Sequence, residues 1–117
     1  MDIVAPMRGG RPAAEASDFY WALADELLER DDVDEGTLMG FPCLRVGGRF
    51  FSTCDHRSGD LIVKLPRQRV AELIEDGVGA PFSPAGRVFK EWALVAERDR
   101  AAWLALMDEA YAFVKGA

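Results

Sequence analysis

The dipeptide Gly47-Gly48 constrains the fold most, because it lies between two runs with strand composition, residues 37–46 and 49–53. A two-residue hairpin turn of the primed type needs positive φ at both positions, and glycine adopts positive φ at no steric cost. Residues 60–65 form a third, almost continuously apolar run, which is typical of a central strand. We therefore predict an antiparallel sheet that starts with this hairpin. Pro42 cannot donate to a strand ladder and marks an edge or a bulge.

Apolar residues at helical spacing predict three helices and leave a fourth strand at residues 87–95. Ser17 is the predicted N-cap of the first helix, which we expect to end near Arg30, before an acidic run. Pro66 opens the second helix and Gly77 ends it. The predicted buried residues of the second and last helices are Val70, Leu73, Ile74, Trp103, Leu106, Met107, Ala110, Tyr111 and Val114. The order is α-β-β-β-α-β-α, an α+β fold with an antiparallel sheet of about four strands packed by helices.

The 117 residues suffice for one domain, which we place at residues 15–117 after a flexible N-terminal arm at 1–14. The sequence does not begin with a basic segment followed by an apolar run, so we do not expect a secretory signal. No apolar stretch is long enough to span a bilayer. Two cysteines do not make a disulfide framework in a chain of this size. We expect a cytoplasmic protein with reduced thiols and no membrane partner.

Charge is distributed unevenly along this acidic chain, whose formal net charge is -6. Residues 15–35 carry nine acids and one base, whereas residues 45–69 carry six bases and two acids. The net charge argues against broad affinity for nucleic acid, but the second segment allows a local basic surface. A nucleic-acid-binding wing, with the Gly47-Gly48 hairpin and residues 57–69 touching phosphates, is therefore an alternative function. Ordinary solvated faces explain the same pattern.

The stretch TCDHRSGD at residues 53–60 contains the only histidine and one of the two cysteines. With a simple hairpin register, Cys43 lies opposite Ser52 and diagonal to Cys54, and His56 shares that face if the strand continues. This juxtaposition permits a metal site or a thiol-dependent enzyme. Structural zinc usually needs four ligands in paired spacing, and an activated thiolate needs a partner that the sequence does not show. The composition of the stretch favours a polar turn between strands.

Cationic residues inside predicted strands mark the candidate binding site. The members are Arg45, Arg49, Lys64 and Lys90, together with Trp92. Gathered on one sheet face, they could hold a small anion or an aromatic ring. The alternative is a solvated sheet face on which these cations simply meet water. The sequence contains no phosphate loop, nucleophile elbow or zinc-protease motif, so we expect no catalytic residues and no cofactor.

Several segments together resemble the TfoX N-terminal domain, within the wider YjbR-like and MmcQ-like group. The matching segments are Met39-Gly40, residues 44–51, residues 61–66, Pro81-Phe82, residues 86–92 and the closing helix. The similarity covers residues 36–114, although family members often carry Met-Phe-Gly-Gly where this chain has Met-Gly-Phe-Pro at 39–42. The resemblance implies a YjbR-like α+β domain and supplies no catalytic set. Lys64, Lys90 and Trp92 match recurrent family positions.

The sequence therefore predicts a small cytoplasmic binding or interaction domain of the TfoX N-terminal type, and enzymatic activity is not expected. Its expected partner is a protein or a small anionic ligand, and nucleic acid is the alternative. A metal-dependent or thiol-dependent enzyme that uses Cys43, Cys54 and His56 is the second alternative. A monomer and a homodimer are equally compatible with the sequence. The family's competence regulator carries a further helical DNA-binding domain that this sequence lacks, so we do not expect a role in transcription.

Overall fold

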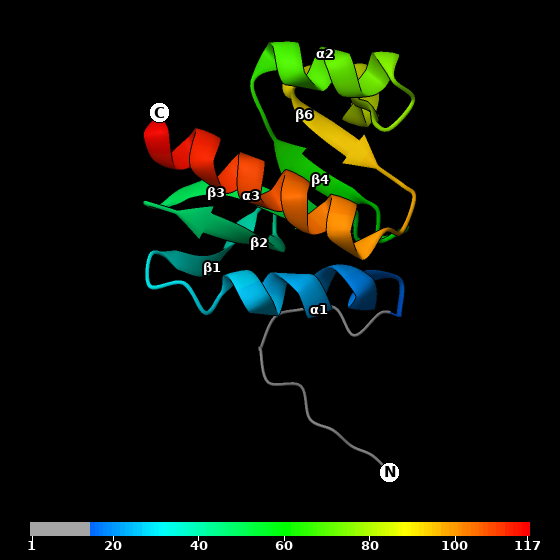
Figure 1. Cartoon of the computed structure of the whole chain (residues 1–117). Coiled ribbons are helices and arrows are strands. Elements are labelled where there is room, and N and C mark those ends of the chain that lie inside the picture. The colour runs from blue at the N-terminus through cyan, green and yellow to red at the C-terminus, as the bar shows by residue number, and fades with distance from the viewer. Residues whose placement is uncertain (1–14) are drawn as a thin grey trace.

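The computed structural model describes residues 15–117, so the predicted arm at 1–14 lies outside the described residues. This part of the chain contains three helices, six strands and two short 3₁₀ turns, η1 and η2 (Figure 1). In chain order they are η1 (Glu15–Ser17), α1 (Asp18–Leu27), β1 (Val33–Leu38), β2 (Phe41–Val46), β3 (Arg49–Cys54), β4 (Leu61–Lys64), α2 (Arg67–Glu75), β5 (Ala80–Phe82), η2 (Pro84–Gly86), β6 (Phe89–Val95) and α3 (Arg100–Gly116).

The strands form one antiparallel sheet in the order β1-β2-β3-β4-β6-β5. The predicted α+β class with an antiparallel sheet is confirmed, but the sheet has six strands where four were predicted. The predicted central position of the third apolar run is also confirmed, because β4 lies between β3 and β6. Its nearly continuous apolar sequence follows from burial on both faces of the sheet.

The predicted single strand at residues 37–46 is wrong, because a tight turn at Met39-Gly40 divides it into two strands. Both turn residues have positive φ, 52° at Met39 and 84° at Gly40, so that Leu38 pairs with Phe41. This is the backbone of a primed hairpin turn, but methionine seldom adopts positive φ and gave no turn signal. The new strand β1 reaches back to Val33 through acidic residues, which are depleted in strands.

The predicted Gly47-Gly48 hairpin is confirmed, with Val46 opposite Arg49. The register beyond it is not the predicted one, because a β-bulge interrupts the pairing of β2 with β3. As a result Leu44, not Cys43, lies opposite Ser52. An extra residue in one strand of a pair shifts every later partner, and side-chain alternation alone does not reveal it.

Between the predicted second helix and the predicted strand at 87–95, the structure has a further short strand, β5, which pairs with β6 at the edge of the sheet. Three residues that include Pro81 give no periodic signal, and proline is tolerated there because an edge strand has one unpaired side. The predicted strand at 87–95 begins two residues later, at Phe89.

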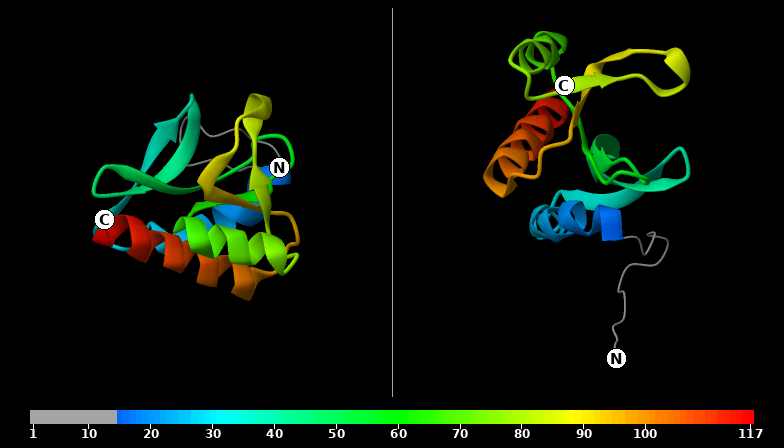
Figure 2. Two further views of the ribbon diagram at one scale, coloured as in Figure 1. Left: turned by 90° about the horizontal axis from the view of Figure 1, so that it is seen from above. Right: turned by 90° about the vertical axis from the view of Figure 1, so that its right-hand side faces the viewer.

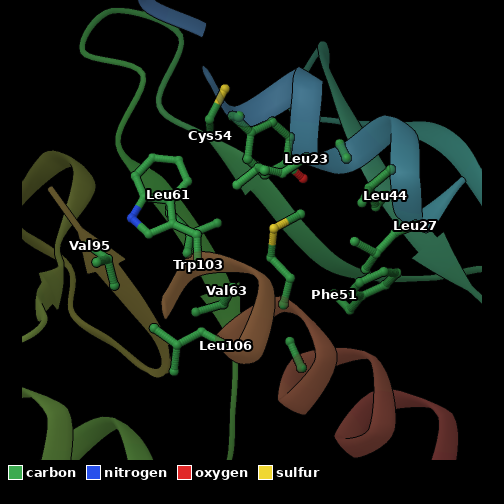
Figure 3. Packing of buried hydrophobic residues seen from close by; sticks show 14 of the residues in the cluster. Leu23, Leu27, Leu44, Phe51, Cys54, Leu61, Val63, Val95, Trp103 and Leu106 are labelled. Atoms are coloured by element: carbon green, nitrogen blue, oxygen red, sulfur yellow. The ribbon is translucent and has the colours of Figure 1, made fainter. Parts of the chain in front are cut away.

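All three helices pack against one face of the sheet, and their apolar residues join a single buried cluster (Figures 2 and 3). The cluster includes Tyr20 from α1, Leu73 from α2, Trp103 from α3 and Val63 from β4. The predicted buried helix faces are confirmed with two exceptions. Tyr111 is only partly buried, and Ile74 is 38% exposed.

Hydrogen bonds confirm the predicted polar turn, which joins β3 to β4. The Asp55 carboxylate accepts from the backbone N–H groups of Arg57 at 2.8 Å and Ser58 at 3.0 Å. The Asp55 N–H donates to the carbonyl oxygen of Asp60 at 2.8 Å, and the Gly59 N–H donates to that of Asp55 at 2.8 Å. An aspartate that bonds its own downstream backbone in this way is a common turn device.

Gly59 → Ala should destabilise the fold more than Gly47 → Ala, although both glycines have positive φ (79° and 62°). A Cβ at Gly59 would lie 1.7 Å from the carbonyl oxygen of Ala16, whereas nothing lies within 4 Å of a Cβ at Gly47. We expect a loss of about 1–2 kcal/mol at Gly47 from the backbone conformation alone, and about 3 kcal/mol or more at Gly59. Urea unfolding of the two variants measures both values. Equal losses would show that the contact between the turn and η1 does not constrain Gly59.

Candidate functional site

Of the five candidate site residues, Arg45 and Arg49 make hydrogen bonds to other groups of the protein. The Arg45 guanidinium donates to both carboxylate oxygens of Asp34 on β1, at 3.3 and 2.7 Å, and this pairing raises its pKa. Arg49 donates to the backbone oxygens of Val114 at 2.9 Å and Ala117 at 3.1 Å. Because Arg49 caps the carboxyl end of α3, where cations are favoured, its role in the structure is to hold the helix end.

The other three candidates lie in two adjoining places, and Trp92 belongs to both. Lys64 and Trp92 lie directly opposite each other on β4 and β6, and the Lys64 amine is 4.0 Å from the Glu91 carboxylate. Lys90 lines a groove beside α2 together with Arg67, and it also lines an adjoining hollow together with Trp92. The structure therefore brings Trp92 near both lysines and places Arg45 and Arg49 elsewhere.

A mainly apolar cavity lined by Trp92 has a volume of about 250 Å³, and we call it the open-face pocket. It lies where the β1–β2 hairpin and the β5–η2 segment project from the sheet on the side away from α3 (Figure 2). Its lining residues are Leu38, Met39, Phe41, Thr53, Cys54, Asp55, His56, Ile62, Phe82, Pro84 and Trp92. Concave sites with mainly apolar walls and a few polar groups are typical of ligand-binding pockets.

Aromatic rings form two walls of the open-face pocket. On one side the Phe41 ring stacks on the His56 imidazole, with centroids 4.0 Å apart and planes within 9°. On the other side Trp92 stacks with Phe82, at 5.2 Å between centroids and 26° between planes. Met39 at the mouth is 66% exposed. The walls thus offer flat apolar surfaces that remain accessible from solvent.

The cysteines are free and buried, and their surroundings disfavour the thiolate. Burial raises the pKa of Cys54 to about 12, and the negative charge of Asp55 adds to the effect. Burial also raises the pKa of Cys43. Of the proposed thiol and histidine set, Cys54 and His56 line the open-face pocket, whereas Cys43 does not. A reactive thiol needs a lowered pKa, so this environment does not supply the chemistry of a nucleophile.

Within residues 15–117, no three side chains of histidine, cysteine, aspartate or glutamate are grouped so that they could hold a metal ion. Asp55 lines the same pocket, but its carboxylate is engaged by the turn. Burial opposes its ionisation, and hydrogen bonds from the backbone of Ser58 and Arg57 outweigh that effect and lower its pKa. The Asp55 carboxylate therefore stabilises the β3–β4 turn and also lines the pocket.

Sequence reasoning missed most of the pocket, in particular Met39, Phe41, Ile62 and Phe82. Phe41 belongs to a strand that the sequence did not separate from its neighbour, and Phe82 belongs to a strand that the sequence did not predict. One signal was present: Met39 and Phe41 are apolar residues flanking a glycine, and in the structure both are more than one-third exposed. Exposed apolar residues close together often mark a binding surface.

Comparisons with protein-family models, with curated proteins and with solved structures found no match to this chain. Within the described part of the chain, no helix combines the length and apolar character needed to cross a membrane.

Cys54 should resist alkylation in the folded protein at neutral pH. A pKa of about 12, against the ordinary 9.0, leaves it about 1000-fold less thiolate than a free thiol. Iodoacetamide labelling at pH 7 followed by peptide mapping measures this, with the urea-unfolded protein as the reference. We expect slow labelling in the native state and ordinary labelling after unfolding. Native Cys54 that labels as fast as the unfolded thiol would instead restore the thiol-dependent hypothesis.

Proposed function

We propose that this chain is a non-catalytic binding domain that holds a small aromatic compound in the open-face pocket. The observation that carries the proposal is an apolar cavity of about 250 Å³ with aromatic walls on the sheet face away from the helices. An apolar cavity of about 150 Å³ is enough to bind benzene. The larger volume here suits a compound with two fused rings.

The residues around the pocket support a ligand with one flat apolar part and one anionic group. Aromatic contacts with Phe41, His56 and Phe82 would stabilise the rings. Trp92, whose indole already contacts the rings of Phe50, Phe82 and Phe89, would form the firm wall behind them. Lys64 lies opposite Trp92, and its exposed pairing with Glu91 spans 4.0 Å. An ion pair of this kind contributes little, so a ligand carboxylate can compete with Glu91 for the lysine. This assignment retains Lys64 and Trp92 from the predicted site and omits Arg45, Arg49 and Lys90.

The resemblance to the TfoX N-terminal domain and to the YjbR-like fold is part of the same proposal. It is supported by the order of the matching segments, two of which, residues 44–51 and 61–66, coincide with the neighbouring strands β2, β3 and β4. The cytoplasmic location is also proposed, and it is supported by the two free cysteines. A protein partner and a homodimer remain compatible with this assignment.

The nucleic-acid alternative has less support from the observed contacts. Of the six cations in the hairpin and residues 57–69, Arg45 is held by Asp34, Arg49 by the end of α3, Arg69 by Glu109 and Glu72, and Lys64 lies 4.0 Å from Glu91. Among residues 15–117, this leaves two wing cations without a carboxylate partner, Arg57 and Arg67. A wing that grips phosphates needs cations that are free to exchange counterions for the nucleic acid.

Binding of 2-naphthoate tests the proposed function, because this probe combines two fused rings with a carboxylate. A titration of ¹⁵N-labelled protein should shift the resonances of Phe41, His56 and Phe82 and should saturate. Phe82 → Ala should weaken the affinity for 2-naphthoate by about threefold to tenfold, because the variant lacks one aromatic contact with the probe.

Val78 → Ser is the matched control, because Val78 is 46% exposed and does not line the pocket. Its affinity for 2-naphthoate should equal that of the original chain. Absence of saturable shifts at millimolar probe, or equal losses in the two variants, would contradict the proposed function.

A further inference from the structure

A second surface is marked by cations that lack a carboxylate partner among residues 15–117. Of the twelve Lys and Arg residues in this range, seven form ion pairs and Arg49 bonds backbone oxygens. The remaining four are Arg57, Arg67, Arg87 and Lys90. Three of these four gather around one residue, Phe89: Arg67 and Lys90 line a groove with it, and the Arg87 guanidinium lies 5.3 Å from its ring centroid.

This groove, which we call the α2–β6 groove, has a volume of about 190 Å³ and runs between α2 and the β5–β6 edge of the sheet. Arg67 and Lys90 supply its charges, and Ile74, Val88 and Phe89 supply much of its apolar lining. Ile74 is 38% exposed and Val88 is 52% exposed. The sequence predicted Ile74 as a core residue, so its accessible position in the groove requires another explanation.

The charges that line the groove, Arg67 and Lys90, are opposite in sign to the formal net charge of the whole chain, which is -6. The adjoining hollow contains one carboxylate, Glu91, and this group lies 4.0 Å from Lys64. Arg67 and Lys90 therefore remain available to carboxylates from outside. Exposed apolar residues rimmed by unpaired cations fit a partner that is both apolar and acidic.

We propose that the α2–β6 groove docks an acidic, apolar peptide segment of a partner protein. An aliphatic or aromatic side chain of the peptide packs between Ile74 and Val88, and flanking carboxylates pair with Arg67 and Lys90. Single-stranded nucleic acid fits less well, because base stacking needs open aromatic faces. The groove offers aliphatic side chains, and its one ring, Phe89, stacks on Trp92 at 4.8 Å and lies under Arg87.

The groove and the open-face pocket share no lining residue, so the two proposals can fail separately. The probe for the groove is a short unlabelled peptide in which glutamate alternates with leucine and phenylalanine. It is titrated into the ¹⁵N-labelled full chain at low ionic strength. We expect saturable shifts centred on Arg67, Ile74, Val88 and Lys90. Shifts centred on Phe41, His56 and Phe82 would overturn the groove assignment.

Charge reversal tests the ionic part of the interaction. The double variant Arg67 → Glu with Lys90 → Glu should lose about tenfold or more in affinity, the loss expected for two exposed ion pairs. Arg57 → Glu is the matched control, because Arg57 is the fourth cation without a carboxylate partner and lies outside the groove. We expect it to change affinity by less than about twofold. If the control loses as much as the double variant, the binding is non-specific and the proposal fails.

Val88 → Ser tests the apolar part and should weaken binding by about threefold to tenfold, with Val78 → Ser unchanged. Circular dichroism verifies folding of each variant, and the neutral pair Arg67 → Gln with Lys90 → Gln replaces the charge reversal if that variant unfolds. A peptide with lysine in place of glutamate should not bind. Equal binding of that peptide, or tighter binding of an oligothymidine strand, would overturn the proposal.

Discussion

The Trp103 indole joins three parts of the chain at the centre of the core. It is fully buried, and its Nε1–H donates to the carbonyl oxygen of Glu97 at 2.7 Å. The edge of the Phe19 ring from α1 meets it at 4.9 Å between centroids, and the Arg98 guanidinium lies 5.3 Å from its centroid. Since burying an indole requires a partner for its N–H, the turn before α3 has to adopt the observed path. That path fixes where α3 crosses the sheet.

Arg98 extends this arrangement from the core to the β3–β4 turn. Its guanidinium donates to the Asp60 carboxylate and to the carbonyl oxygen of Ser58, each at 2.6 Å. A second polar contact within the buried layer joins α1 to β3, where the Tyr20 hydroxyl donates to that of Ser52 at 3.0 Å. Burial raises the pKa of Tyr20 far above its ordinary value, so this hydroxyl keeps its proton.

The parts of the fold that the sequence predicted depend on local patterns. The Gly47-Gly48 turn, the turn around Asp55 and the apolar stripe of α3 each follow from residues close together in the chain. The missed features depend on distant or atypical residues: Met39 adopts positive φ without being glycine, and β5 has three residues. In the candidate site, too, the features that the sequence did not reveal depend on contacts between distant residues. Arg49 bonds Val114, 65 positions away, and no local pattern shows that this cation is already occupied.

The open-face pocket and the α2–β6 groove have no lining residue in common, yet their walls touch at Phe89, which contacts both Trp92 and Phe82. Phe89 lines the groove, Trp92 lines the pocket, and their rings stack 4.8 Å apart with 21° between planes. A ligand that enters the pocket without moving Trp92 or Phe82 leaves the groove as it is, since the Phe82 ring also lies 5.9 Å from that of Phe89. A ligand that reorients either ring has to repack Phe89 as well, because packed rings cannot separate without losing contact energy. The geometry of these three rings therefore determines whether the two surfaces act independently.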